Sequence, residues 1–214
     1  MPVSLKKNIY IVFSCTNTKI GAMIRYVTKN KYNHVSIALE GDLKTMYSFT
    51  RYRANAPLVA GFSEESPLRY IYDNTDVKIC RIPVSEEKYK EVFDYIEEIQ
   101  KNSKRYIYNY LSALLVPTGR KICIPDAYTC LEFCVHILSK YRVAEGISDR
   151  SFYNIVDLEK LLEPYAAYEG SISGIAVPNG WGNDVYPDYM KGKIRICAGS
   201  AKQFGRLFYR LVRV

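Results

Sequence analysis

The apolar positions in the first third of the chain follow the period of β-strands more often than that of helices. Alternating or continuous runs of β-branched and aromatic residues, bounded by turn residues, are typical of strands. Such runs predict strands over residues 8–13, 34–39, 45–50 and 77–82. Residues 40–42 predict the turn of a hairpin that joins the second and third of these strands. Residues 19–28 instead show the i, i+3, i+4, i+7 apolar spacing of an amphipathic helix.

The remainder of the chain is mainly helical in its pattern. A long helix is predicted to begin at Ser85, and its buried face is expected to carry Tyr89, Val92, Phe93, Ile96 and Ile99. Helical spacing predicts further helices over residues 106–116, 129–140, 156–162 and 201–214. Residues 170–188 are rich in Gly, Pro and Asn and predict a loop. Strands and helices mix without regular βαβ alternation, so we expect an α+β domain.

Cys130 stands at a predicted helix start, where thiol chemistry is favoured. Thr129 and Glu132 match a capping box, in which the hydroxyl accepts from the backbone of the first turn and the carboxylate reaches back. Cys130 would then be the first helical residue, beside unpaired N–H groups and the positive end of the helix dipole. That position favours the thiolate, which is the nucleophilic form of cysteine. Glu132 opposes this effect, because it is an anion in the same turn.

Two other interpretations of the cysteines compete with a nucleophile. Free cysteines are usually small buried hydrophobes, which is our expectation for Cys80, Cys134 and Cys197 and an open alternative for Cys130. A zinc site made by Cys130, Cys134 and His136 is the other. At about 100° per residue, Cys134 lies about 40° from Cys130 around the helix, but His136 lies about 240° round. These three side chains cannot converge on one ion, so we expect no metal and no cofactor.

The chain has only two histidines, so the candidates for a general base are few. His34 heads a predicted strand and shares one face of it with Ser36 and Ala38. These small neighbours would let a helix start approach closely, as a Cys–His pair requires. A histidine at a strand end is otherwise a polar edge residue. His136 stands in the middle of a predicted helix, where we expect a structural or solvated role.

A third residue normally orients the imidazole of such a pair. If residues 40–42 are the whole hairpin loop, Ser48 lies directly across from His34 and is the candidate for this role. A register slip of one residue would place Phe49 there instead. The candidate catalytic set is therefore Cys130, His34 and Ser48.

A resemblance to a known family rests on four segments, Tyr10–Phe13, Ile24–Thr28, Tyr32–Ala38 and Tyr128–Cys134. They resemble bacterial proteins of the permuted papain-like group, which is related to NlpC-type cell-wall peptidases and to lecithin retinol acyltransferase-like enzymes. In that group the histidine precedes the cysteine, as His34 precedes Cys130 here; ordinary papain-like proteins have the reverse order. The resemblance covers roughly residues 8–162.

The resemblance implies a circularly permuted papain-like fold, in which an antiparallel sheet packs against the helix that carries the cysteine. It implies Cys130 as nucleophile and His34 as base. The family's third position would fall near Ser48, where many members carry His or Glu. It does not name a substrate.

These observations lead to a thiol hydrolase or acyltransferase that acts on an amide or ester through an acyl-enzyme. The expected substrate is a small-molecule, peptide or lipid acyl donor. The alternative is a catalytically weak or inactive binding module on the same scaffold.

The positive charge is concentrated at the end of the chain. Seven of the net eight charges belong to residues 191–214, which contain no acidic residue. We divide the chain into a catalytic domain, 1–169, and a loop with a basic amphipathic segment, 170–214. The apolar face of that segment, expected to be Phe204, Leu207, Phe208 and Leu211, docks on the domain or lies on an anionic membrane. Nucleic acid is not expected, because no binding motif accompanies the charge.

The six cysteines are scattered and form no C-x-x-C pair, which suits a reducing compartment. The apolar run that begins at Ile9 is too short for the core of a signal peptide. We therefore expect a cytoplasmic protein.

Overall fold

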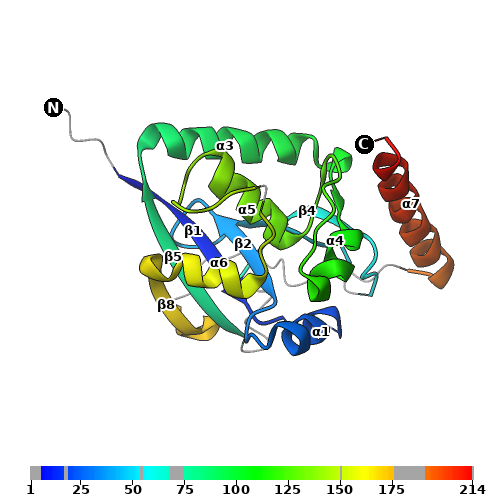
Figure 1. The fold of residues 1–214 in the computed structure, drawn as a ribbon, viewed down its shortest axis with the longest axis horizontal. Coiled ribbons are helices and arrows are strands. Elements are labelled where there is room, and N and C mark those ends of the chain that lie inside the picture. The colour runs from blue at the N-terminus through cyan, green and yellow to red at the C-terminus, as the bar shows by residue number, and fades with distance from the viewer. Residues whose placement is uncertain are drawn as a thin grey trace.

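Six strands form the main sheet of the protein, in the order β4-β3-β2-β1-β5-β8, and every neighbouring pair is antiparallel (Figure 1). The computed structural model describes residues 6–16, 19–53, 55–67, 75–149, 151–175 and 191–213. The strands of the sheet are β1 (Lys7–Ser14), β2 (His34–Ala38), β3 (Met46–Arg51), β4 (Ala60–Glu65), β5 (Asp76–Val84) and β8 (Ala166–Ser171). A separate parallel pair consists of β6 (Ile107–Tyr108) and β7 (Ala127–Tyr128). The predicted α+β class with an antiparallel sheet is confirmed.

Six α-helices accompany the sheet within the described residues. They are α1 (Lys19–Thr28), α3 (Glu86–Lys101), α4 (Tyr110–Leu115), α5 (Cys130–Lys140), α6 (Ile155–Leu161) and α7 (Lys193–Leu211). Short 3-10 turns are η1 (Ser103–Arg105), η2 (Val116–Thr118), η3 (Glu163–Tyr165) and η4 (Ile172–Gly174). None of the helices in this part of the chain is long and apolar enough to cross a membrane.

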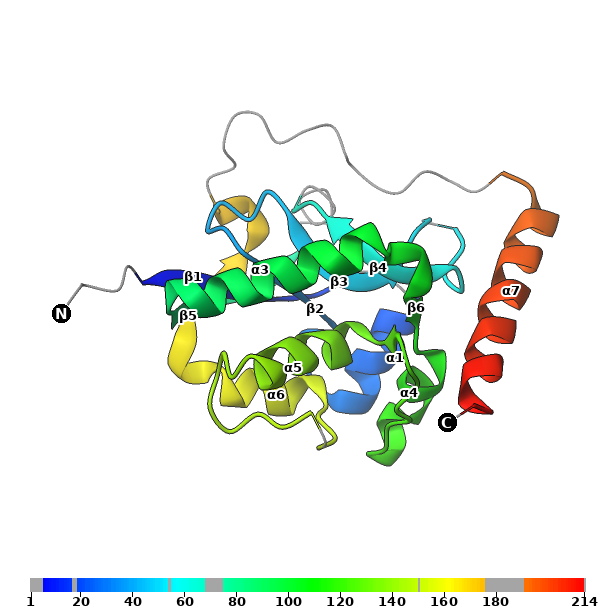
Figure 2. The ribbon, with the colours of Figure 1, turned by 90° about the horizontal axis from the view of Figure 1, so that it is seen from above.

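The larger core lies between one face of the sheet and helices α3, α5 and α6 (Figure 2). Alternation along the strands sends Phe13, Val35 and Ile37 into this core, because successive strand residues point to opposite faces. Phe49 and Phe133 bring the sheet and α5 together, with ring centroids 5.3 Å apart. A smaller core on the opposite face includes residues from β1, β2, β3, β5 and η4. The sheet is therefore buried on both faces around β1 and β2.

Most predicted elements exist, and the errors have physical causes. Strands β4 and β8 were not predicted, because the sequences AGFSEE and AAYEGS lack a strand's apolar pattern. The helix expected over 106–116 is shorter and is limited to α4, Tyr110–Leu115, because Ile107 and Tyr108 instead form strand β6. Phe93 was expected in the core but is 40 % exposed, whereas Val92, Ile96 and Ile99 are buried. The apolar stripe of α3 is thus narrower than predicted.

The predicted hairpin register between β2 and β3 is wrong. The observed pairs are Ile37 with Tyr47 and Ala38 with Met46, so the connection runs from residue 39 to residue 45. Leu43 explains the longer connection: it adopts φ 54° and is 2 % exposed within the smaller core. Continued along the strands, this register places Ser48 opposite Ser36. Ser48 therefore does not lie across from His34.

Strand β8 and helix α7, in the C-terminal part of the chain, both pack against the rest of the protein. β8 pairs with β5, so the predicted domain boundary after residue 169 falls inside a strand. Helix α7 begins at Lys193, earlier than residue 201, and packs near β4, β6 and α4 (Figures 1 and 2). Of its predicted docking residues, Leu207 is fully buried and the ring of Phe204 packs at a tilt against Tyr110, but Phe208 is 51 % exposed. Most of the loop predicted over 170–188, residues 176–188, lies outside the described residues.

Candidate functional site

His34 is the first residue of β2 and is held from both neighbouring strands. It pairs with Ser14 of β1, and the Asn33 backbone N–H donates to the Ser14 carbonyl at 3.1 Å. The Asn33 side chain accepts from the backbone N–H and the hydroxyl of Thr16. On the other side, the Ser48 hydroxyl donates to the Val35 carbonyl at 2.8 Å. These bonds fix the backbone on both sides of His34. They therefore also fix the position of the Cα atom from which its imidazole side chain extends.

The imidazole of His34 forms a buried cluster with Glu65 and Ser36. His34 Nε2 lies 2.9 Å and 3.1 Å from the two carboxylate oxygens of Glu65, at the end of β4. The Ser36 hydroxyl donates to Glu65 Oε2 at 2.5 Å and lies 3.2 Å from His34 Nε2. The side chains of His34 and Glu65 are 9 % and 1 % exposed, so water screens their interaction little.

Cys130 occupies the first helical position of α5, as the capping pattern predicts. The Glu132 backbone N–H donates to the Thr129 hydroxyl at 3.1 Å, and the Thr129 N–H donates to the Glu132 carboxylate at 2.8 Å. Both halves of the predicted capping box are therefore present. Helix α5 packs against β2 and β3. The capped end of the helix thus brings Cys130 to the strand that carries His34.

The structure brings the side chains of His34 and Cys130 together. Burial by itself would lower the pKa of His34, but the charge of Glu65 and then the charge and hydrogen bond of Cys130 raise it to about 10. A second hydrogen bond, with Glu65, acts in the same direction. The imidazole of His34 therefore interacts with both a carboxylate and a thiol, and both favour its charged form.

Ser48 is not part of this cluster, and Glu65 takes the place predicted for it. The Ser48 hydroxyl donates its hydrogen bond to the Val35 carbonyl, and the side chain is fully buried. Glu65 was not among the predicted site residues, because β4 was not predicted and nothing else in the sequence marks this glutamate. A strand prediction for Ala60–Glu65 would have placed an acid at a buried strand end, which is the only signal that could have identified it.

Residues from β6 and the start of α4 support the N-terminus of α5. The pKa of Tyr108 is raised, first by burial and then by the charge of Cys130, so its phenol lies near the thiol. The fully buried Asn109 side chain donates to the Ile122 carbonyl at 2.8 Å and lies 3.3 Å from the Glu132 carboxylate. Burial raises the pKa of Glu132, while its bonds to Ser112 and Thr129 counteract this. Glu132 therefore serves the helix cap.

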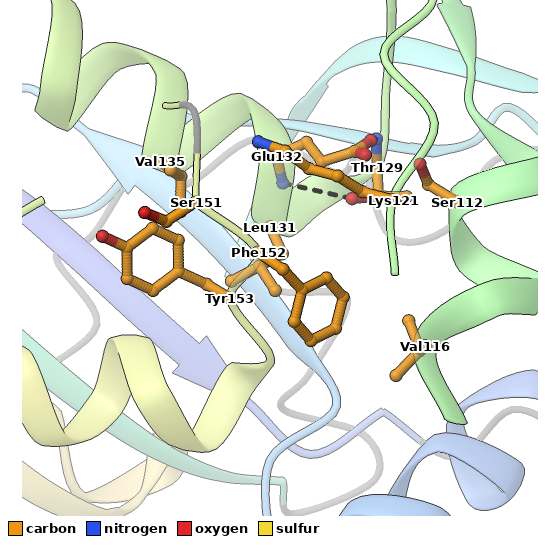
Figure 3. Close-up of a pocket in the computed structure, with 10 residues that line it drawn as sticks. All are labelled: Ser112, Val116, Lys121, Thr129, Leu131, Glu132, Val135, Ser151, Phe152 and Tyr153. Carbon is orange, nitrogen blue, oxygen red and sulfur yellow. Dashed lines mark hydrogen bonds between the residues drawn. The ribbon is translucent and has the colours of Figure 1, made fainter. Parts of the chain in front are cut away.

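A pocket that is partly open to solvent lies beside this helix start, with about 360 Å³ of empty space when the solvent at its mouth is included (Figure 3). From α5 it is lined by Leu131, Glu132 and Val135, which point about 100–200° away from Cys130 around the helix. Cys130 is not among the lining residues. The remaining lining residues are Ser112, Val116, Lys121, Thr129, Ser151, Phe152 and Tyr153. The pocket is thus behind the cysteine and does not lead to its sulfur.

His136 lies apart from Cys130, on the outer part of α5. Its Nδ1 is 2.8 Å from Asp149 Oδ2, and its ring packs between Tyr95 and Tyr128. Cys134 is fully buried in the larger core, and burial raises its pKa well above the ordinary value. Across the described ranges, no group of three or more His, Cys, Asp or Glu side chains is arranged to hold a metal ion.

Comparison with known proteins adds no further assignment. No family model, no curated protein and no solved structure matches this chain. The cluster of His34, Glu65 and Cys130 is therefore the feature of this chain that bears on its function.

Proposed function

We propose that the protein is a thiol hydrolase or acyltransferase in which Cys130 is the nucleophile and His34 the acid–base. The observation that carries the proposal is the buried triad Cys130, His34 and Glu65, with a thiol at a capped helix start beside an imidazole that a carboxylate orients. A papain-like arrangement, circularly permuted, is the corresponding proposal for the fold.

The reaction begins with the Cys130 thiolate, which the imidazolium of His34 stabilises. The sulfur attacks the carbonyl carbon of an amide or ester, and a C–S bond forms. His34 donates its proton to the leaving amine or alcohol as the bond to the acyl carbon breaks. Water or an acceptor then attacks the thioester while His34 takes up its proton; the C–S bond breaks, the acyl group leaves on the acceptor, and the thiolate of Cys130 and the imidazolium of His34 are restored.

Two further groups have defined tasks in this scheme. The backbone N–H of Cys130, at the unpaired start of α5, donates to the oxyanion that forms on the carbonyl oxygen. Glu65 is a positioning residue: it holds Nε2 of His34, which leaves Nδ1 for the proton exchanged with the sulfur.

The test is covalent labelling with an electrophilic ester probe that leaves its acyl group on a reactive thiol. We expect mass spectrometry to find the acyl thioester on Cys130 and the Cys130→Ala variant to lose it. Cys123→Ala is the matched control, because Cys123 is an exposed thiol outside the triad. Equal labelling of Cys130→Ala and the wild type would reject the nucleophile.

The low exposure of Cys130, 8 %, favours one second candidate, a binding module without catalysis on the same scaffold. Under that hypothesis Cys130 is alkylated no faster than an unassisted thiol, and the His34→Gln substitution leaves the alkylation rate unchanged. A rate that falls in His34→Gln favours the enzyme.

A further inference from the structure

We infer that the outward face of α7 is a docking surface for an anionic lipid bilayer. The inference does not depend on the proposed catalysis. It differs from the expectation drawn from the sequence, because the face formed by Phe204, Leu207 and Leu211 is occupied by the domain itself.

The inner face of α7 is fixed by polar as well as apolar contacts. The Gln203 amide donates to the Ala60 carbonyl at 3.1 Å. The Arg206 guanidinium donates to the Lys104 carbonyl at 2.6 Å, and Arg210 donates to the Pro125 and Asp126 carbonyls at 3.0 Å each. These two arginines hold the helix on the domain and are not available to a partner.

The outer face carries an apolar stripe that is exposed in the part of the chain that the structure describes. Ile194 and Val212 are each 85 % exposed, and Phe208 is 51 % exposed. Ile194 and Val212 are eighteen residues apart, about five whole turns, so they project in the same direction, and Phe208 lies within about 40° of them. The stripe therefore runs about 27 Å along the helix. Tyr209, 56 % exposed, lies on one side of it.

Basic side chains flank this stripe on both sides. Lys193 lies on one side, and Arg195, Lys202 and Arg213 lie on the other, about 100° from the stripe. All four residues are exposed. No acidic residue occurs between 191 and 214 to offset them. The Arg213 guanidinium lies 4.2 Å from the centre of the Tyr209 ring, which adds an amphipathic aromatic group at the border.

An apolar stripe with basic residues on both sides favours an anionic bilayer as the partner of this face. An anionic bilayer attracts the basic flanks and also buries the apolar stripe at the boundary between headgroups and acyl chains. A nucleic acid or an acidic protein surface would satisfy the charges alone and leave Ile194, Phe208 and Val212 in water. The helix would lie in the plane of the interface, with its inner face still on the domain.

The experiment is flotation of the full chain with vesicles of phosphatidylcholine alone or of phosphatidylcholine with phosphatidylglycerol. We expect binding to the anionic vesicles only. Phe208→Ser should weaken it about tenfold or more, and Phe93→Ser, at an apolar site on α3 that is 40 % exposed, should not. The pair Arg195→Gln and Lys202→Gln should weaken it about thirtyfold, whereas Lys90→Gln with Lys101→Gln on α3 should not.

The changed side chains of α7 are exposed, so unchanged thermal melting of each variant verifies the fold. Failure of the wild type to float, or equal flotation with neutral vesicles, overturns the inference. So does equal weakening by the α3 controls, which would indicate net charge alone. A fourth outcome also overturns the inference: the wild type does not bind vesicles but self-associates, and Phe208→Ser abolishes the self-association. The stripe would then be a contact with a second copy of the chain.

Discussion

The two histidines of this chain form the same chemical pair in two different surroundings. His34 lies 2.9 Å from Glu65, and His136 lies 2.8 Å from Asp149. The first pair is almost completely buried, whereas in the second the histidine side chain is 18 % exposed and the aspartate 47 % exposed. The distance between the histidine nitrogen and the carboxylate oxygen therefore does not distinguish the two pairs. Burial makes the charge of Glu65 effective, and only His34 has a thiol beside it.

The comparison predicts that the two histidines differ most in catalysis. We expect His34→Gln to lower kcat/KM of the acyl-transfer reaction by about 10²–10⁴-fold, because the proton transfers lose their carrier. His136→Gln should leave kcat/KM nearly unchanged. Steady-state kinetics with the ester that labels Cys130 measures both values. A comparable loss in His136→Gln would remove the distinction between the two pairs.

The carboxylates should differ in their contribution to stability. Glu65→Gln removes the buried carboxylate that pairs with the His34 imidazole, which should lower the free energy of unfolding by about 3–5 kcal/mol. Asp149→Asn breaks a partly exposed pair and should cost about 1 kcal/mol or less. Urea unfolding monitored by circular dichroism measures both. Equal costs would mean that burial is not what separates the pairs.

The pH dependence of that stability difference has a defined sign. The pKa of His34 is raised from about 6.5 to about 10 in the folded protein. Its stabilisation is therefore complete below about pH 6.5 and is lost as the pH rises through 10. The difference between the wild type and Glu65→Gln should shrink over this window, because Glu65 is the largest cause that raises the pKa. Unfolding curves measured across the window test it; a constant difference would contradict the assignment.

The smallest effects concern the two serines. Ser36→Ala removes a hydrogen bond to the charged Glu65 and should cost about 1.5–3 kcal/mol of stability, together with some activity. Ser48→Ala removes a bond to a neutral carbonyl and should cost about 1 kcal/mol without changing kcat. The measurement is kcat together with the free energy of unfolding for each of the two variants. A larger loss of kcat in Ser48→Ala would restore the role first predicted for it.

The structural elements that carry the candidate site were predictable where their patterns are local in sequence. The capping box at Thr129 and the alternation around His34 are both short-range patterns, and both led to the correct elements. The hairpin register was not predictable, because it depends on Leu43, which the smaller core buries at a positive φ. Glu65 was not predictable either, since its burial arises only when β4 joins β3.

The C-terminal helix shows the same limit. Its amphipathic period identifies the helix, but a period alone does not say which of two apolar sectors meets the domain. Contacts to the backbone carbonyls of Lys104, Pro125 and Asp126 decide this, and those carbonyls are brought to α7 by the rest of the fold. Side chains on a helix surface are therefore assigned to partners only after the tertiary structure is known.

The residues of the triad are far apart in the sequence, and this separation affects the order in which the molecule folds. Glu65 and His34 are 31 residues apart, and Cys130 follows His34 by 96 residues. Closing such long loops is slow and is rewarded only when the distant segments dock, so these contacts form late. No fragment of the chain that lacks either β4 or α5 can contain the triad. Under the proposed function, we expect the appearance of His34-assisted thiol reactivity during refolding to report completion of the native topology.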